Sequence, residues 1–302
     1  MNEYDLILFD RIEKIKQINK QYDLEHNAYI SFSGGKDSTI LHYLIDLALP
    51  NNNIPRVYIN TGIEYTAVRK YVMQLASNDK RVIVINSGVN IKNMLIKYGY
   101  PFKSKEHSLK VNLYQHGQRS ASVIRYKEGG QFQCPKILQY QFNNDFKLNV
   151  SSMCCNKLKK EPIKRWQKEN RKPITLTGMR QAEGGQRANI GCILTDANGN
   201  LKKFHPLLVV NEEFEKDFIK RNNIKLCKLY YPPYNFKRTG CKGCPFNLNL
   251  QKDLEVINKL LPNEYKQCLI LWKPVYDEYI RIGYRLKQYP HLVLRKQVKK
   301  LF

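Results

Sequence analysis

The chain has 302 residues, of which 42% are hydrophobic, and its 51 Lys and Arg against 26 Asp and Glu give a formal net charge of +25. This length is enough for one large domain or two modest ones, and no apolar run is long enough to cross a bilayer, which excludes an integral membrane protein. The first residues carry acidic groups and lack a small-residue cleavage site, so we expect no signal peptide and a cytoplasmic protein.

The positive charge indicates an anionic partner larger than a nucleotide, and nucleic acid, either DNA or tRNA, is the first candidate. The alternative is a lysine-rich composition spread over a solvated surface. Residues 157–172 hold eight basic residues against two acidic ones. Further basic residues follow near the C-terminus: Arg281, Arg285, Lys287, Arg295, Lys296, Lys299 and Lys300.

The first part of the chain alternates helical and strand-like patterns. Apolar residues at helical spacing predict an amphipathic helix near the start: Leu8, Ile12, Ile15 and Ile18. Strands are expected at residues 28–32, 56–60 and 81–85, with helical stretches between them, and a later strand at 173–177. This βαβαβ order predicts an α/β fold with a doubly wound parallel sheet, whose ligands lie beyond the carboxyl ends of the strands.

The first of these strands leads into the segment Ser31-Phe32-Ser33-Gly34-Gly35-Lys36-Asp37-Ser38, and a helix follows. Two glycines allow backbone N–H groups to approach an anion at the positive end of the helix dipole, while serine hydroxyls and Lys36 add further donors. The pattern therefore predicts a phosphate site, although its spacing is not that of a Walker loop. The alternative is a plain Gly-Gly turn in which Asp37 or Ser38 starts the helix.

Residues 33–38 resemble the pyrophosphate-binding loop (PP-loop) of the N-type ATP pyrophosphatases, and the surrounding chain resembles the phosphoadenosine phosphosulfate (PAPS) reductase branch of that superfamily. The resemblance implies an adenine nucleotide alpha-hydrolase-like fold that binds ATP, adenylyl sulfate or PAPS together with Mg²⁺. Lys36 and Asp37 are then the expected catalytic residues, with Asp37 as the nearest carboxylate for the metal. The expected nucleotide-binding residues are Ser31, Ser33, Gly34, Gly35, Lys36, Asp37, Ser38, Thr61, Gly62, Gly178, Arg180 and Arg187.

Two later segments carry the resemblance further. Residues 57–65 close a strand with Thr-Gly and an acidic residue, like the family's loop near the adenosine. Residues 177–187 are similar to its anion-binding segment, in which guanidinium groups such as those of Arg180 and Arg187 can clamp phosphate or sulfate oxygens. A surface salt bridge with Glu183 is the alternative.

Periodicity weakens between residues 98 and 150, where basic residues are frequent. We interpret this stretch as a mobile or helical insertion over the nucleotide cleft, where a large substrate docks; a solvated helical excursion is the alternative. The chain is accordingly divided into a nucleotide-binding α/β domain, 1–225, and a small helical C-terminal subdomain, 226–302, that carries a cysteine loop. Within these parts the expected elements are an amphipathic helix over 212–221, an edge strand over 226–231, and helices near 250–261 and 263–282.

Eight cysteines in a reducing compartment favour ligands over disulfides. Cys154-Cys155 and the later Cys241-Lys242-Gly243-Cys244 could give four thiolates to a tetrahedral zinc or a four-iron cluster, but adjacent ligands are unusual for zinc. Together they look like the cluster-binding arrangement of the adenylyl sulfate reductases, which implies a [4Fe-4S] cluster, with zinc as the alternative. That family usually has arginine where Leu158 stands. The four other cysteines are expected to be small core residues, although Cys192 could carry sulfur: Cys134, Cys192, Cys227 and Cys268.

The reductases attack sulfate sulfur with a cysteine in a C-terminal tail, and no cysteine follows Cys268. The combination of loop and cluster therefore resembles the sulfur-inserting ATP pyrophosphatases of DNA phosphorothioation and tRNA thiolation. We expect ATP to adenylate a nucleic acid and sulfur, from the cluster or a sulfur-donor protein, to displace AMP. The alternatives are reduction of adenylyl sulfate or PAPS with an external thiol, and an ATP-sensing nucleic-acid binder with a structural cluster.

Overall fold

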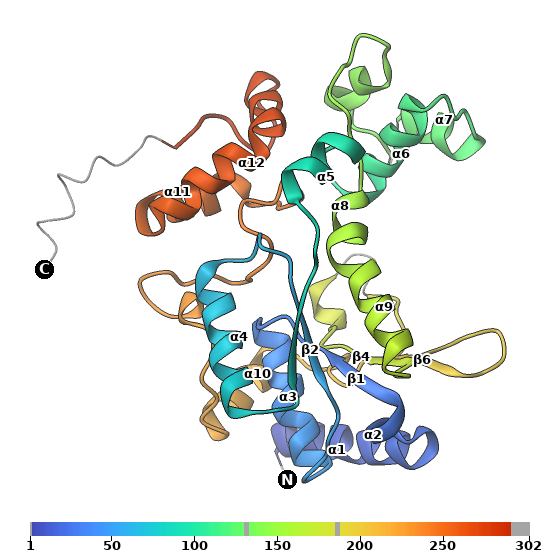
Figure 1. Cartoon of the computed structure of the whole chain (residues 1–302), viewed down its shortest axis with the longest axis vertical. Coiled ribbons are helices and arrows are strands. Elements are labelled where there is room, and N and C mark those ends of the chain that lie inside the picture. Colours follow the sequence, from blue (N-terminus) through green and yellow to red (C-terminus); the bar gives the residue numbers. More distant parts are fainter. Residues whose placement is uncertain (1, 130–132, 185–187, 291–302) are drawn as a thin grey trace, which may run out of the picture. The chain divides into compact units, whose positions relative to one another are not determined.

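The computed structural model describes residues 2–129, 133–184 and 188–290 (Figure 1). The chain divides into two compact units, each made of two separate stretches of sequence. The first unit is Met1–Ser87 with Glu161–Thr239, and the second is Gly88–Lys160 with Gly240–Phe302. No helix among the described residues combines the length and the apolar character that a bilayer crossing needs.

The first unit is built on a six-stranded sheet with the order β3-β2-β1-β4-β6-β5. Its strands are β1 (Ala28–Ser31), β2 (Arg56–Asn60), β3 (Val82–Asn86), β4 (Ile174–Leu176), β5 (Ile193–Thr195) and β6 (Leu201–Phe204). All neighbouring pairs are parallel except β5 with β6. The strand order reverses its direction between β1 and β4, and ligands of such sheets bind at this switch point beyond the carboxyl ends of the strands.

Helices cover both faces of this sheet, because alternate residues of its strands point to opposite sides. On one face Ile30 of β1 belongs to the main core, together with residues of α1, α3 and α10, such as Ile15, Ile40 and Phe214. On the other face Tyr29 packs against Val57 and the ring of Trp166, 5.3 Å away in α9. The helices of this unit are α1 (Glu3–Tyr22), α2 (Leu24–Asn27), α3 (Lys36–Ala48), α4 (Thr66–Asn78), α9 (Glu161–Glu169) and α10 (Glu212–Arg221).

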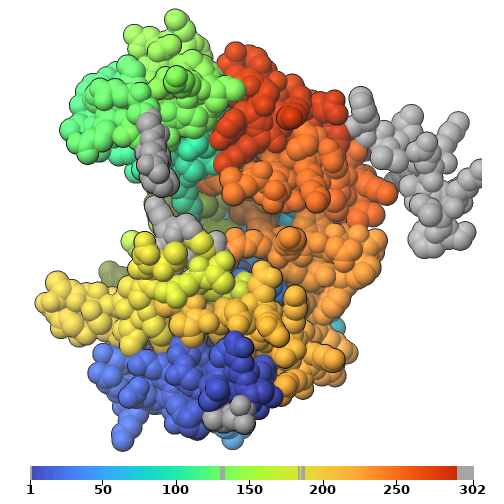
Figure 2. Space-filling view, turned by 180° about the vertical axis from the view of Figure 1, so that it is seen from behind, coloured from blue at the N-terminus to red at the C-terminus, as the bar shows by residue number. Residues whose placement is uncertain are grey.

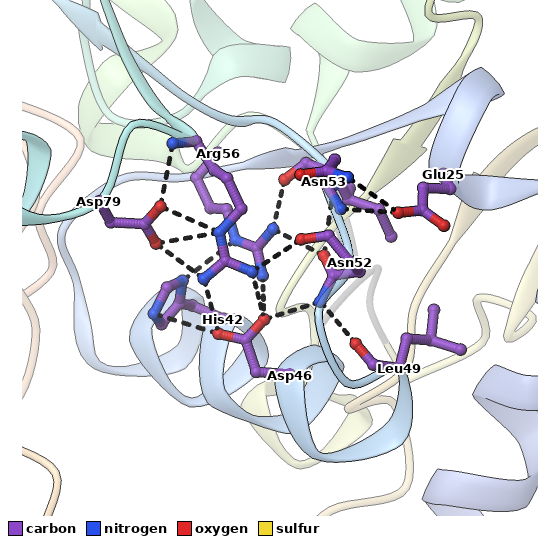
Figure 3. A network of polar contacts seen from close by, with 10 residues as sticks. Glu25, His42, Asp46, Leu49, Asn52, Asn53, Arg56 and Asp79 are labelled. Atoms are coloured by element: carbon purple, nitrogen blue, oxygen red, sulfur yellow. Dashed lines mark hydrogen bonds and ion pairs between the residues drawn. The ribbon is translucent and has the colours of Figure 1, made fainter.

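A buried polar network lies where β2 begins (Figure 3). The Arg56 side chain is fully buried, and its three nitrogens all have acceptors. Nε donates to His42 (3.1 Å), Nη1 to Asn52 (2.9 Å) and Nη2 to Asp46 (2.6 Å). Burial and the charge of Arg56 lower the pKa of His42 to about 4, so the imidazole stays neutral and can accept. Each ionic group of this network is therefore paired inside the fold.

The second unit is helical, with α5 (Ile91–Tyr98), α6 (Lys105–Gln115), α7 (Ala121–Glu128), α8 (Met153–Cys155), α11 (Leu250–Leu260) and α12 (Pro262–Arg281). A 3₁₀ helix, η1 (Lys136–Phe142), and a π-helical turn, η2 (Asn156–Lys160), complete it. Buried His107 of α6 bonds the Tyr126 hydroxyl (3.1 Å) and the Gln141 side chain (2.7 Å). The stretch expected to be an insertion is thus a folded part of the second unit and packs on α12, where the Phe102 and Tyr279 rings lie 4.5 Å apart. It is green in Figure 2.

The α/β class, the mostly parallel sheet and the helices α10, α11 and α12 are confirmed. The edge strand expected over 226–231 is wrong, because this segment forms the 3₁₀ turn η5 (Lys228–Tyr230), closed by the bond from Tyr231 N–H to Lys228 O. A β5–β6 hairpin, which the sequence pattern did not predict, forms the edge instead. The two units also differ from the expected division at 225/226, since residues 88–160 cluster with the C-terminal stretch.

Candidate functional site

The loop between β1 and α3 requires glycine at one position, because the backbone is left-handed there and no space is left for a Cβ. Gly34 has a φ of +68°, and a Cβ added there would lie 2.5 Å from the side chain of Val72. Serine and threonine hydroxyls then hold the turn from inside. Ser33 N–H donates to Ser38 Oγ (3.2 Å), while Ser38 Oγ and Thr39 Oγ1 donate to the Gly35 carbonyl at 3.0 and 2.9 Å. The loop is therefore shaped before any ligand binds.

A tyrosine hydroxyl lies at the N-terminus of α3. The first residue of the helix, Lys36, donates its N–H to the Tyr230 hydroxyl (2.9 Å), which also bonds Thr239 Oγ1 (2.8 Å). The N-cap residue, Gly35, has no side chain that could accept this hydrogen bond. The amides of a helix N-terminus attract phosphate oxygens, so the tyrosine hydroxyl marks a place that such an oxygen could occupy or contact.

Two cations and two carboxylates meet beside this loop. The Lys36 ammonium lies 2.7 Å from Glu215 Oε2. Arg180 Nε lies 3.1 Å from Glu215 Oε1 and 3.4 Å from Asp37 Oδ1. The Glu215 side chain is 1% exposed, and burial, followed by the nearby Asp37, raises its pKa to about 7. Glu215 thus changes charge near neutral pH, next to the lysine expected to bind phosphate.

The same four-residue cluster contains buried polar atoms without hydrogen bonds among the described residues. They are Asp37 Oδ1, Arg180 Nε and Nη1, and both carboxylate oxygens of Glu215. Four of these five atoms are ion-paired at 2.7–3.4 Å, whereas no partner is found for Arg180 Nη1 among the described residues. Since buried polar groups in folded proteins nearly always have a partner, this nitrogen indicates a place for an anionic ligand.

The other expected nucleotide-binding residues follow the same edge of the sheet. Gly178 follows β4, and a Cβ there would lie 2.7 Å from the Asp37 carbonyl, so this loop packs directly on the start of α3. Ser31 ends β1, and Thr61-Gly62 follows β2 with Thr61 bonded to Glu64 (2.6 Å). Arg187 lies outside the described residues, as does the side chain of Glu183. The carboxyl edge thus holds each described member of the set.

The two cysteine pairs lie in the second unit. Cys154 and Cys155 form α8, and Cys241 to Cys244 form a turn closed by a backbone bond of 3.3 Å. The neighbouring Cys155, burial and both later cysteines raise the pKa of the Cys154 thiol. Cys154 and nearby lysines lower the pKa of Cys155. Four thiols in cationic surroundings match the donor set of an iron–sulfur or zinc site, although no three His, Cys, Asp or Glu groups in the described ranges have metal-binding geometry.

Three aromatic side chains of helix α12 donate hydrogen bonds to backbone carbonyls of the cysteine turn. Trp272 Nε1 donates to Lys242 O (3.0 Å), the Tyr276 hydroxyl donates to Gly243 O, and the Tyr279 hydroxyl donates to Pro245 O (2.9 Å). These three aromatic residues are spaced so that they share one face of the helix. The aromatic clamp was not predicted from the sequence, where its only signal is the spacing Trp-x₃-Tyr-x₂-Tyr.

The remaining four cysteines are buried or partly buried. Cys134, Cys227 and Cys268 are buried, as expected for core residues. Cys192 is partly buried, packs on the main core of the first unit, and directs its thiol at the His205 carbonyl (3.5 Å). Two important residues of the nucleotide site, Glu215 and Tyr230, were not predicted, because each reaches the loop from a distant part of the sequence.

Comparisons with known proteins give a family and several similar structures. Residues 27–247 match the family model of the phosphoadenosine phosphosulfate reductase domain. An uncharacterized protein of Methanocaldococcus jannaschii is 24% identical over 310 residues, which cover 97% of this chain and 61% of the relative. The chain therefore spans about three fifths of that relative's length.

Among solved structures, a Candida auris PAPS reductase in complex with phosphate has a TM-score of 0.45 and 16% identity, and the match covers 80% of this chain and 96% of the reductase chain. A U34-tRNA thiolase from Methanococcus maripaludis, with its [4Fe-4S] cluster, has a TM-score of 0.40 and 16% identity, and the match covers 90% of this chain and 79% of the thiolase chain.

Proposed function

Because the chain belongs to the phosphoadenosine phosphosulfate reductase domain family, we propose that it binds ATP at the loop before α3 and adenylates a nucleic acid for sulfur transfer. The observation that carries the proposal is the buried cluster of Lys36, Asp37, Arg180 and Glu215, in which two cations meet two carboxylates and Arg180 Nη1 has no partner among the described residues. A phosphate chain would supply acceptors for both cations. The net charge of +25 supports a polyanionic co-substrate.

In this proposal the loop binds the nucleotide through its backbone. The amides around Gly34 and Gly35 and the N-terminus of α3 would bind the phosphates, with Ser33 and Ser38 adding hydroxyl donors. Lys36 would exchange its partner Glu215 for a phosphate oxygen. Arg180, already beside Asp37, would bind the nucleotide's reacting end, and the sequence resemblance adds Thr61, Gly62 and Arg187.

The proposed reaction has two steps. An oxygen of the nucleic acid attacks the α-phosphorus of ATP, a new P–O bond forms, the bond to the bridging oxygen breaks, and pyrophosphate leaves. Lys36 would neutralise the charge that develops on this leaving group, and Asp37, the nearest carboxylate, would hold Mg²⁺. In the second step hydrosulfide, delivered by a sulfur-donor partner, displaces AMP from the activated atom without a change in oxidation state.

The four cysteines of the second unit would hold a [4Fe-4S] cluster: Cys154, Cys155, Cys241 and Cys244. With all four irons ligated by cysteine thiolates, such a cluster would have no iron open to carry the sulfur, and it would supply structure and redox capacity to the second unit. Anaerobic purification followed by iron and zinc analysis tests this assignment. We expect about four irons per chain, loss of iron in Cys241→Ser, and unchanged iron in Cys192→Ser. A colourless wild-type protein containing zinc would contradict it.

Pyrophosphate release from ATP tests the adenylation step. We expect release that depends on added single-stranded DNA or tRNA and falls about 100- to 1,000-fold in Lys36→Met, since the charge opposite the leaving group is lost. Lys216→Met removes an exposed lysine of α10 and serves as the control with unchanged release. ATP-dependent binding of nucleic acid with no pyrophosphate would favour the ATP-sensing alternative and reject the enzyme.

The family match also supports a second candidate, reduction of adenylyl sulfate or PAPS by an external thiol. The same loop and Arg180 would then bind the sulfonucleotide, and a thiolate supplied by a partner would attack its sulfur. The measurement that separates the two candidates is sulfite formation from either sulfonucleotide in the presence of a dithiol. Sulfite without nucleic-acid-dependent pyrophosphate would establish the reductase.

A further inference from the structure

The second unit contains a pocket of about 430 Å³ between the end of α6 and the loop at residues 143–149. This volume is within the range of roughly 300–1,000 Å³ that is common for small-ligand sites. The side chains relevant to its chemistry are Tyr114, Arg119, Asn143, Asn144, Phe146 and Lys147. None of these residues belongs to the cysteine loop or to the nucleotide site.

Two aromatic rings in the pocket wall are held in place by other rings. Tyr114 is half-buried and meets Phe142 edge-on at 5.3 Å, and Phe146 meets Tyr140 edge-on at 5.5 Å. Rings that are already ordered lose little entropy when a planar ligand stacks on them. Aromatic side chains of this kind are the usual platforms for unpaired bases in single-stranded nucleic acids.

Cations surround the Tyr114 ring. The Arg119 guanidinium lies 3.5 Å from the ring centroid, and its Nη1 donates to the backbone carbonyl of Tyr114 (2.7 Å). The Lys127 ammonium lies 5.2 Å from the same centroid. Both cationic groups are held near the ring, where they can bind a phosphate next to a stacked base.

Amides and charge complete the complementarity to a nucleotide. Asn143 and Asn144 are exposed side chains at the pocket, and an amide offers the adjacent donor and acceptor that a base edge requires. Of the described residues, the pocket lining includes Arg119 and Lys147 but no carboxylate. Residues 98–150 contain eight Lys and Arg against three Asp and Glu. A pocket of the first unit, between α1 and α10, is the opposite case, since Glu3, Glu213 and Asp217 line it.

We propose that the pocket of the second unit binds single-stranded nucleic acid, with one unpaired base stacked on the Arg119 guanidinium that lies over the Tyr114 ring, and with the adjoining phosphates bound by the same guanidinium and Lys147. The inference rests on the proposed function for its choice of nucleic acid over a small anion. It adds to that function a recognition site for the substrate and a preference for unpaired strands.

Fluorescence anisotropy with labelled ten-nucleotide oligo(U) and oligo(dT), without ATP, tests the proposal. Tyr114→Ala removes the ring that holds the Arg119 guanidinium in place and should weaken binding by about 5- to 100-fold. Arg119→Gln changes an exposed residue and should also weaken binding, and it should reduce the slope of log affinity against log salt by about 0.7 for each phosphate that the variant no longer neutralises. A thermal melt of each variant checks that the fold is intact.

The matched control is Arg221→Gln. Arg221 also stands over a tyrosine ring, 4.1 Å from the centroid of Tyr4, but it lines the acidic pocket of the first unit. Unchanged binding in this variant, with tighter binding of either oligonucleotide than of a duplex, supports the pocket. Equal losses in Arg119→Gln and Arg221→Gln, wild-type affinity in Tyr114→Ala, or equal affinity for a duplex would overturn it.

The result is separable from the proposed adenylation. If the variants lose oligonucleotide binding but the wild-type protein releases no pyrophosphate, the pocket stands and the adenylation proposal fails. If the wild-type protein releases pyrophosphate in response to oligonucleotide and every variant binds as the wild type does, the pocket is rejected and the adenylation proposal stands.

Discussion

Arg56 and Arg180 are both buried in the first unit, yet their neighbours satisfy them very differently. Every guanidinium nitrogen of Arg56, at the start of β2, has an acceptor. Arg180, beyond the end of β4, has its Nε ion-paired with two carboxylates, but its Nη1 has no partner among the described residues. An unsatisfied buried donor costs free energy that a ligand can recover. The contrast separates a structural network from the proposed binding site.

The largest effect is expected from removing the acid that pairs with Arg56. Asp46→Ala leaves Arg56 buried without its carboxylate and also breaks the two bonds from Arg81 (2.8 and 3.0 Å). We expect a loss of about 3–5 kcal/mol of unfolding free energy, the usual cost of leaving a buried charge unpaired. Urea unfolding measures it. A loss below about 1 kcal/mol, typical of an exposed pair, would remove the distinction between the two clusters.

The next prediction concerns pH. Burial raises the pKa of Glu215 from 4.5 to about 7, so between these values the folded chain binds a proton that the unfolded chain does not. Stability should therefore fall as pH rises through this window, by up to about 3 kcal/mol relative to Glu215→Gln.

The contribution of Asp46 to stability has the opposite pH dependence. Burial alone would raise its pKa, but Arg81 and Arg56 hold it below the usual value, so its contribution is lost as pH falls.

Urea unfolding of the wild type and Glu215→Gln at pH 5, 6, 7 and 8 checks this prediction. The two curves of stability against pH should converge near pH 5 and separate towards pH 8. Parallel curves would show that Glu215 has an ordinary pKa, and they would remove the argument that its charge is held unfavourably while no phosphate is bound.

Replacing each arginine by lysine compares the two sites directly. Arg56→Lys cannot restore a planar set of hydrogen bonds and should cost about 2–3 kcal/mol of stability. Arg180→Lys should change stability by less than about 1 kcal/mol, because few bonds are lost, yet weaken ATP binding by about tenfold through loss of bidentate contacts. Urea unfolding and ATP titration by calorimetry measure both. If Arg180→Lys unfolds as easily as Arg56→Lys and binds ATP normally, Arg180 is structural.

The sequence was sufficient for the features that local patterns determine. Glycine spacing, a preceding strand and a following helix define the loop at Gly34-Gly35, and alternation of strands and helices defines the parallel sheet. The two cysteine pairs were also recognisable from spacing. Each of these features depends on neighbours within a few residues, whose side chains share a strand, a turn or a helix face.

The rest depended on contacts between distant segments. Glu215 meets Lys36 across 179 positions, and nothing in α10 alone distinguishes this buried carboxylate from its exposed neighbours Glu212 and Glu213. Residues 226–231 suggested a strand because they are apolar, yet Tyr230 turns its hydroxyl to the amide of Lys36 instead. The division into two units was likewise not predictable, because each unit joins two separate stretches.

The smallest expected effect concerns that tyrosine. Tyr230→Phe keeps the ring but leaves the Lys36 N–H without its acceptor, which should cost about 1 kcal/mol of stability in the free protein. If a phosphate oxygen replaces the hydroxyl in the complex, ATP recovers this loss, and the stability difference between variant and wild type should shrink at saturating ATP. Thr239→Val removes the hydroxyl's other partner (2.8 Å) and leaves the amide bonded, so it is the matched control. A Tyr230→Phe deficit that is the same with and without ATP would mean that the hydroxyl, like the partners of Arg56, serves only to hold the fold together.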